Sequence, residues 1–291
     1  MKLNQALHQA GEVLAHQDIE DSALESELLL RQALGISWVE LYQDLNRELS
    51  SGEEAGFERL ISRRLSGEPI AYITGHREFF GLDFYVDASV LIPRPETELL
   101  VEKALSLARE RLIATIADIG TGSGAIAVSL ALNLPQTKVF ATDVSASALK
   151  VARLNSQRHG VLDRVCLRQG DLLSPLPEPV DLIIANLPYV KQEEVSRRGL
   201  AIFEPELALA GGYDGLRRIR ELCHKLGDRL SPGGSLLLEV GIGQSRAVAG
   251  LLYSLFPFAK IEITPDLSGI DRVISLILGL TPVCPDAKLS C

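Results

Sequence analysis

The feature that most constrains the fold is a regular alternation of strand-like and helix-like segments that begins at residue 115. Short runs of aliphatic and β-branched residues alternate with longer segments of helical periodicity. The predicted strands cover 115–119, 138–143, 164–168, 180–185, 235–240, 259–264 and 272–278, and the predicted helices cover 97–110, 124–133, 145–159, 213–230 and 243–255. This alternation is typical of a mostly parallel sheet covered by helices on both faces.

The end of the chain departs from that pattern. Only the segment PDLSGID joins the last two predicted strands. A parallel crossover needs a dozen or more residues, so these two strands are expected to pair antiparallel. We therefore predict an α/β fold with a seven-stranded, mostly parallel sheet and an antiparallel last strand.

The first 70 or so residues have a different pattern of apolar residues. Apolar spacing predicts helices over 2–16 and 22–34, and a third helix from a cap at Ser50 or Ser51 to residue 65. Aromatic and β-branched residues then flank Gly75 and Gly81, which indicates a hairpin over about 72–86. The predicted organisation is a helical domain over 1–71, a hairpin linker over 72–90, the α/β domain over 91–281 and a flexible tail over 282–291.

Charge and cysteine usage exclude several classes of partner. The net charge is −9, and residues 1–75 hold 6 Lys/Arg against 13 Asp/Glu, a net of −7. An acidic chain gains little from attraction to phosphate backbones, so we expect no stable nucleic-acid complex. No apolar run approaches the ~18 residues of a membrane span. The chain has four cysteines, Cys166, Cys223, Cys284 and Cys291, and none has metal-ligand spacing. We therefore expect reduced thiols and no bound metal, as is usual in the cytoplasm. The prediction is a cytoplasmic monomer.

A glycine-rich loop follows the first predicted strand and opens a helix. In ADIGTGSGAIAVSLA, Gly120, Gly122 and Gly124 permit a tight turn and a close approach of backbone to ligand, with Thr121 and Ser123 between them. Amides at the helix start then face the ligand. The GxGxG spacing also occurs in simple turns, but the strand before it and the helix after it favour a nucleotide-like cofactor. No lysine follows the glycines, which disfavours a triphosphate.

Two aspartates end the next two predicted strands. Asp143 can accept hydrogen bonds from both hydroxyls of a ribose, and its alternative role is to cap the helix that begins near Ser145. Asp171 can accept from an adenine amino group. It can equally well form a turn after Gly170.

The fourth predicted strand ends in IIANLPYV, beside the strand that carries the glycines. A planar NH2 group is a poor nucleophile because its lone pair is delocalised. The Asn186 side-chain oxygen and the Leu187 carbonyl can each accept one N–H and free that lone pair for methylation. Pro188 fixes the direction of the carbonyl, and Tyr189 offers a flat face for stacking. The alternative is a turn that merely ends the strand.

These residues resemble a known family. NLPY resembles the (N/D/S)PP(Y/F) motif of methyltransferases that act on planar nitrogens. The segments YITGHREFFGLDFYV, LIPRPETELLVE, DIGTGSGAIAVSLA, FEPELALAGGYDGL, LSPGGSLLLEVGIGQ and DLSGIDRVI resemble the release factor glutamine methyltransferases, in that family's order and over nearly the whole chain. The sheet with a reversed terminal strand is similarly that of S-adenosylmethionine-dependent methyltransferases.

The resemblance implies an enzyme that uses S-adenosyl-L-methionine. Its substrate would be a class I peptide chain release factor, methylated on the side-chain amide nitrogen of the glutamine in the Gly-Gly-Gln loop, which modulates translation termination. Asn186, Leu187, Pro188 and Tyr189 would grip that amide. The helical N-terminal domain would bind the release factor. The residues bordering the cofactor would be Gly120 to Gly124, Asp143, Asp171, Leu172 and Asn186.

One departure leaves alternatives open. The family has proline where this chain has Leu187, which keeps the carbonyl but loses a second stiff ring. N-L-P-Y also resembles the motif of ribosomal RNA adenine dimethyltransferases, so a nucleic-acid adenine N6-methyltransferase is the alternative function. A cofactor-binding partner without activity is a third hypothesis. The hypothesis of a dehydrogenase has the least support, because the site lacks a hydride-transfer partner.

Overall fold

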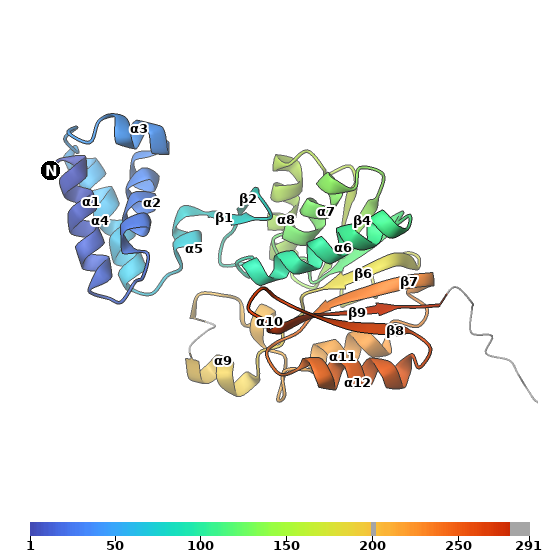
Figure 1. Ribbon diagram of the computed structural model, residues 1–291. Helices are drawn as coiled ribbons and strands as arrows, with labels where there is room; N and C mark the ends of the chain where they lie inside the picture. Colours follow the sequence, from blue (N-terminus) through green and yellow to red (C-terminus); the bar gives the residue numbers. More distant parts are fainter. Residues whose placement is uncertain (199–201, 280–291) are drawn as a thin grey trace, which may run out of the picture. The chain divides into compact units, whose positions relative to one another are not determined.

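A computed structural model describes residues 1–198 and 202–279, and the expected tail over 282–291, with Cys284 and Cys291, lies outside these residues. The chain forms two compact units, Met1–His76 and Arg77–Cys291 (Figure 1). Each unit has its own apolar core. No helix in the described ranges combines the length and apolarity that a membrane crossing needs.

The first unit is helical. Its helices are α1 (Leu3–Ala15), α2 (Ser22–Leu34), α3 (Trp38–Gln43), α4 (Ser51–Leu65) and α5 (Ile70–Thr74). The three predicted helices are confirmed as α1, α2 and α4, and Leu14, Leu29 and Phe57 lie in their shared core. The prediction missed α3 and α5, which are only one or two turns long. For α3 a signal was present, because Ser37 and Glu40 form a capping box.

A two-stranded hairpin of β1 (His76–Phe79) and β2 (Leu82–Tyr85) follows. It is shorter than the predicted segment, because α5 occupies the residues before Gly75. The hairpin turn places Phe80 and Gly81 at positive φ, 53° and 72°. Glycine adopts that conformation without strain, which explains its place in the turn.

The second unit is built on a seven-stranded sheet. Its order is β5-β4-β3-β6-β7-β9-β8, and only β9 runs against its neighbours. The strands are β3 (Thr115–Ile119), β4 (Lys138–Asp143), β5 (Val165–Gln169), β6 (Val180–Ala185), β7 (Leu230–Glu239), β8 (Lys260–Pro265) and β9 (Asp271–Ile277). The predicted fold class is confirmed, including the antiparallel last strand and the pairing of β3 with β6.

Helices cover both faces of this sheet. They are α6 (Glu98–Glu110), α7 (Ala125–Asn133), α8 (Ala146–Arg158), α11 (Arg217–His224) and α12 (Ser245–Leu255), with a 3₁₀ turn η1 (Pro95–Thr97) before α6. Two short helices, α9 (Gln192–Arg198) and α10 (Glu206–Leu209), belong to the segment that joins β6 to β7. Successive strand residues point to opposite faces. In β6, Leu182 and Ile184 pack toward α6 and α7. Ile183 and Ala185 pack toward α11 and α12 on the other face (Figure 1).

The segment between β6 and β7 differs most from prediction. The helix predicted over 213–230 is limited to α11. Gly215, before α11, has a φ of 78°, which is not helical. After α11, the Arg229 amide donates to the Leu226 carbonyl in a turn. β7 begins at Leu230, earlier than predicted. The short helices α9 and α10 were not predicted.

Candidate active site

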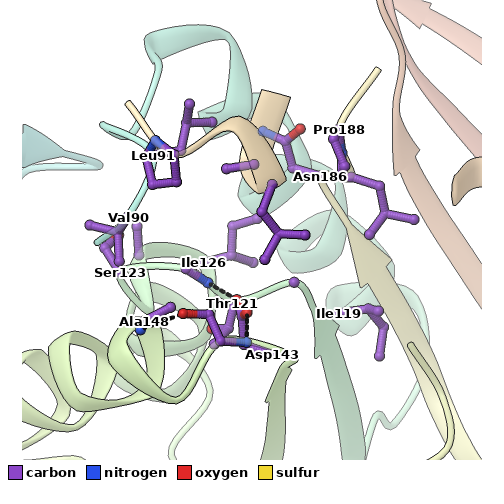
Figure 2. A pocket seen from close by; sticks show the side chains of 18 of the residues that line it. Val90, Leu91, Ile119, Thr121, Ser123, Ile126, Asp143, Ala148, Asn186 and Pro188 are labelled. Atoms are coloured by element: carbon purple, nitrogen blue, oxygen red, sulfur yellow. Dashed lines mark hydrogen bonds between the residues drawn. The ribbon is translucent and has the colours of Figure 1, made fainter. Parts of the chain in front are cut away.

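The carboxyl ends of β3, β4 and β6 meet at one edge of the sheet, where a cavity opens. The chain passes from β3 to β4 on one side, and β6 lies on the other side, so the strand order reverses here. Open parallel sheets bind ligands at such a point. Figure 2 shows Asp143, Thr121 and Ser123 on one side of the cavity and Asn186 and Pro188 on another. The predicted site residues in its lining are Gly120, Thr121, Gly122, Ser123, Asp143, Leu172, Asn186, Leu187 and Pro188.

The glycine-rich loop is held by backbone hydrogen bonds. The amides of Gly120 and Thr121 both donate to the Thr142 carbonyl at 2.9 Å. Gly124 has a φ of 81°, and a Cβ there would lie 3.2 Å from Ala152 on α8. Gly124 is outside the cavity lining, so its role in the structure is to let α7 start close to α8.

Asp143 fastens the same loop to the end of β4. Its Oδ2 accepts the Gly122 amide at 2.9 Å, and its Oδ1 accepts the Ser145 amide at 2.8 Å. The side-chain cap of α8 is Ser145 itself, which accepts from the Ala148 amide. Burial raises the pKa of Asp143. Each carboxylate oxygen has a second lone-pair site, so Asp143 can still accept hydrogen bonds from a ligand.

Two buried polar residues that the sequence analysis missed support the loop. Asp118 in β3 accepts from the Thr121 hydroxyl at 2.6 Å, and burial raises the pKa of this carboxyl to about 7. Asn155 in α8 donates to the carbonyls of Ser123 and Tyr85, at 2.8 and 2.9 Å. A signal for Asn155 was its place one helical turn after Val151 and Ala152, on the face of α8 that is buried.

The NLPY segment begins where β6 ends. Asn186 Nδ2 donates to Thr97 Oγ1 at 3.0 Å, which orients the amide. Leu187 is 4% exposed, and its side chain belongs to the core beside Gly120. Leucine in place of the family's proline therefore adds an apolar core contact and keeps the backbone carbonyl. Pro188 lines the cavity.

Tyr189 lies outside the cavity lining. Its hydroxyl donates to Glu239 Oε1 at 3.1 Å, and its carbonyl accepts from Gln244 Nε2 at 2.9 Å. Burial raises the pKa of the Tyr189 hydroxyl, and burial also raises the pKa of Glu239 to about 7. A stacking role for Tyr189 stays a prediction, whereas its anchoring to β7 is a contact that the sequence did not indicate.

Asp171 is also outside the lining. Its carboxylate pairs with the Arg218 guanidinium and with Lys225 Nζ at 3.4 Å, and the bond from Arg218 lowers its pKa. Its neighbour Leu172 does line the cavity, with a φ of 48°, and its carbonyl accepts from the Thr142 hydroxyl. An adenine contact by Asp171 thus stays a prediction, whereas its ion-pair partner Arg218 does line the cavity.

Two segments distant in sequence form a further wall. Glu204 accepts from Arg94 at 2.5 Å and from the Ile92 amide at 3.2 Å. Pro93, Arg94 and Thr97 from one segment line the cavity together with residues 205, 207 and 208 from the other. The stretches IPRPETE and EPELAL, which resemble the family's pattern, thus lie together at one wall of the cavity.

Comparisons with known proteins place the chain in a family. Residues 5–75 match the family model described as PrmC N-terminal domain, and residues 95–203 match the methyltransferase small domain. The release factor glutamine methyltransferase of Moorella thermoacetica is 42% identical over 94% of this chain and 97% of its own length. The chain belongs to the release factor glutamine methyltransferase family. The resemblance seen in the sequence is thereby confirmed.

A second relative agrees with this assignment, and a solved structure agrees with the fold. The release factor glutamine methyltransferase of Geobacter sulfurreducens is 41% identical over 91% of this chain and 93% of its own. A methyltransferase from Pyrococcus furiosus matches in structure with a TM-score of 0.51 and 19% identity, over 75% of this chain and 97% of the other, which supports the fold alone. The resemblance to methyltransferases thus holds for sequence and fold.

Proposed function

We propose that this protein transfers a methyl group from S-adenosyl-L-methionine to the side-chain amide nitrogen of the glutamine in the Gly-Gly-Gln loop of a class I peptide chain release factor. The observation that carries the proposal is the place of Asn186 and Pro188 at a cavity whose other side is the glycine-rich loop and Asp143. Family membership points to the same reaction.

The residues on the glycine-rich side fit a nucleoside. Asp143 has lone pairs left for ribose hydroxyls, and Gly120 and Gly122 leave room for close approach. When bound, the cofactor supplies an electrophilic methyl group on a sulfonium. Leu172, Ile126 and Val144 provide apolar lining nearby.

The residues on the Asn186 side fit an amide. The Asn186 side-chain oxygen and the Leu187 carbonyl would each accept one N–H of the glutamine amide. These bonds hold the nitrogen in place and favour pyramidal character. Positioning of this kind supplies a large share of the rate in a two-substrate transfer. The nitrogen lone pair would form the new N–C bond as the C–S bond of the sulfonium breaks. The alkylated nitrogen is acidic and would then release one N–H proton to water.

We also propose the setting in which this reaction occurs. The protein would act in the cytoplasm as a monomer, with the release factor as its protein partner and no stable nucleic-acid complex. The acidic helical region over 1–71 would contribute to release factor binding, with 72–90 as linker and 91–281 as the catalytic domain. The net charge of −7 in residues 1–75 supports a partner with a complementary basic surface.

The test is a methylation assay with methyl-labelled cofactor, a purified class I release factor and total RNA as a parallel substrate. Peptide mass spectrometry would locate the added methyl. We expect it on the glutamine of the Gly-Gly-Gln loop, and we expect no labelling when that glutamine is replaced. Labelled RNA adenine with an unlabelled release factor would instead support the alternative reaction.

A further inference from the structure

The NLPY segment, residues 186–189, lies between two points at which the backbone is fixed. Before it, Ala185 is still paired on both sides within the sheet. After it, the Val190 amide donates to the Leu209 carbonyl at 3.0 Å, and the Val190 carbonyl accepts the Gly211 amide at 2.8 Å. The path of the four residues between these points therefore depends on what else holds their backbone.

Gln244 holds this backbone at Tyr189. Its Nε2 donates to the Tyr189 carbonyl at 2.9 Å, and its Oε1 accepts the Gly241 amide at 2.9 Å. A backbone amide can only donate and a carbonyl can only accept, so these two partners fix the orientation of the Gln244 side-chain amide. Gln244 is also the N-cap residue of α12, and its own carbonyl accepts the Val248 amide at 3.1 Å. One side chain thus ties the NLPY segment to the start of α12.

Two glycines leave room for this arrangement. A Cβ at Gly215 would lie 2.3 Å from the Tyr189 carbonyl oxygen and 2.7 Å from Gln244 Nε2, which is the place of the hydrogen bond itself. A Cβ at Gly211 would lie 2.7 Å from the Pro188 carbonyl oxygen. Side chains overlap with fixed backbone at such distances. The segments AGGYDG (210–215) and VGIGQ (240–244) therefore enclose the end of the NLPY segment.

These contacts limit the movement of the groups that the proposed function assigns to the substrate. The Leu187 side chain is buried in the core, and the ring of Pro188 fixes its φ. With the Tyr189 carbonyl also held, few backbone dihedrals in the segment remain free. The direction of the Leu187 carbonyl therefore depends on the bond from Gln244. Misplacement of a reacting group by about 1 Å can lower a rate ~100-fold.

We propose that Gln244 is a positioning residue that holds the NLPY backbone so that the Asn186 side chain and the Leu187 carbonyl face the cavity. Gly211 and Gly215 serve the same purpose by leaving that backbone its space. The inference rests on the proposed function, in which these two acceptors bind the substrate amide. Gln244 is not among the residues that line the described cavity, so it acts through the Tyr189 carbonyl.

The kinetic test uses Gln244→Glu. One carboxylate oxygen can still accept from the Gly241 amide, but the other has no proton to donate and would repel the Tyr189 carbonyl. We expect kcat to fall about tenfold or more, with the KM for the cofactor changed less than about twofold. A residue that served only the loop around Gly241 would tolerate this change. A kcat within about twofold of the unsubstituted protein would overturn the proposal. Gln157→Glu is the matched control, because it adds the same charge on the exposed face of α8.

A glycine pair tests the same bond by steric means. Gly215→Ala would place a methyl group at the bond between Gln244 and Tyr189. Gly269 has nearly the same φ, 76° against 78°, and no atom within 4 Å of its Cβ position. Gly269→Ala therefore reports backbone strain alone. We expect kcat to be at least about tenfold lower in Gly215→Ala than in Gly269→Ala, and equal values would contradict the proposal.

A further test needs no activity. Amide hydrogen exchange, followed by NMR, reports local opening of the backbone. In Gln244→Glu we expect the Val190 and Gly211 amides to exchange about tenfold faster or more, because the neighbouring carbonyl is no longer held. The Thr121 amide, which donates to the Thr142 carbonyl, should keep its rate. Unchanged rates at Val190 and Gly211 would show that Gln244 does not hold this backbone.

The tests separate this inference from the proposed function. If the unsubstituted protein methylates no release factor while Gln244→Glu exchanges faster at Val190 and Gly211, Gln244 holds the segment and the assigned substrate is wrong. If the protein methylates the release factor while Gln244→Glu keeps full activity and unchanged exchange, the function stands and Gln244 does not position the site.

Discussion

At the scale of single residues, the site separates into groups that face the cavity and groups that hold them. Asn186 and Asp143 face it, whereas Glu239 and Asp118 are buried behind them. The facing residues could be predicted because their motifs have chemical meaning in a known order along strands. The supporting residues could not, because Thr97, Asn155 and Glu239 acquire their partners only when distant segments fold together.

Removal of the Asn186 side chain should separate binding from turnover. Asn186→Ala would delete one of the two acceptors proposed for the substrate amide, so we expect turnover to fall ~100-fold or more. Cofactor affinity should stay within about threefold. Single-turnover methylation and calorimetry would measure the two quantities. Asn133→Ala, at the end of α7, is the control, and turnover above a third of normal in Asn186→Ala would refute the assigned role.

Asp143 should have the opposite profile. Asp143→Ala removes the acceptor proposed for ribose hydroxyls together with the anchor of the Gly122 amide. We expect cofactor affinity to weaken ~10-fold or more, because two hydrogen bonds to a charged group are lost. Asp163→Ala is the control, since Asp163 is exposed before β5 at the opposite end of the sheet. Unchanged calorimetric affinity in Asp143→Ala would exclude the ribose contact.

Glu239 should make stability depend on pH with a definite sign. Its pKa rises from 4.5 to about 7 on folding because burial disfavours the charged form. The folded state thus holds the proton more tightly, and the stabilisation present below pH 4.5 is lost as the pH rises through 7. The shift corresponds to roughly 3 kcal/mol. Glu239→Gln removes this dependence. The free energy of unfolding of the variant, measured in urea, should therefore rise relative to that of the unsubstituted protein by about that amount between pH 4.5 and 8. An equal difference at both pH values would argue against a raised pKa.

At the scale of elements, strands were predicted better than the segments between them. β3, β4 and β6 match their predicted bounds because each is a short apolar run that ends at a polar or glycine-rich turn. Helices α3, α9 and α10 were missed, since short helices owe their stability to neighbours more than to their own periodicity. The wall formed by Arg94 and Glu204 likewise depends on a contact between segments far apart in sequence.

The approach of α7 to α8 gives a prediction at this scale. Gly124 and Gly160 both have positive φ, 81° and 67°, but only at Gly124 would a Cβ meet another helix. Gly160→Ala should therefore lower stability by ~1–2 kcal/mol through the backbone alone. Gly124→Ala should lower it by ~1–3 kcal/mol more, because Ala152 must move. Chemical denaturation of both variants measures the difference, and equal losses would mean that helix spacing does not require this glycine.

At the scale of the whole molecule, the cavity and most of the net negative charge lie in different units. Every residue that lines the described cavity lies in Arg77–Cys291, whereas residues 1–75 hold most of the net negative charge. The sequence predicted this contrast, because composition and periodicity change together near residue 75. Each unit also has a core of its own, so the cavity does not depend on the helices of the first unit for its lining.

This division predicts how the protein responds to loss of its first unit. A fragment that begins at Arg77 keeps both cores of the sheet and all the cavity-lining residues, so its cofactor affinity should stay within about threefold of the full chain. Its kcat/KM for an intact release factor should fall ~100-fold or more, because the fragment lacks the helical region proposed to bind the release factor. For a short peptide with the Gly-Gly-Gln sequence, fragment and full chain should be equal within about threefold, since such a peptide reaches only the cavity. Equal kcat/KM on the intact release factor would mean that the acidic helices take no part in substrate binding.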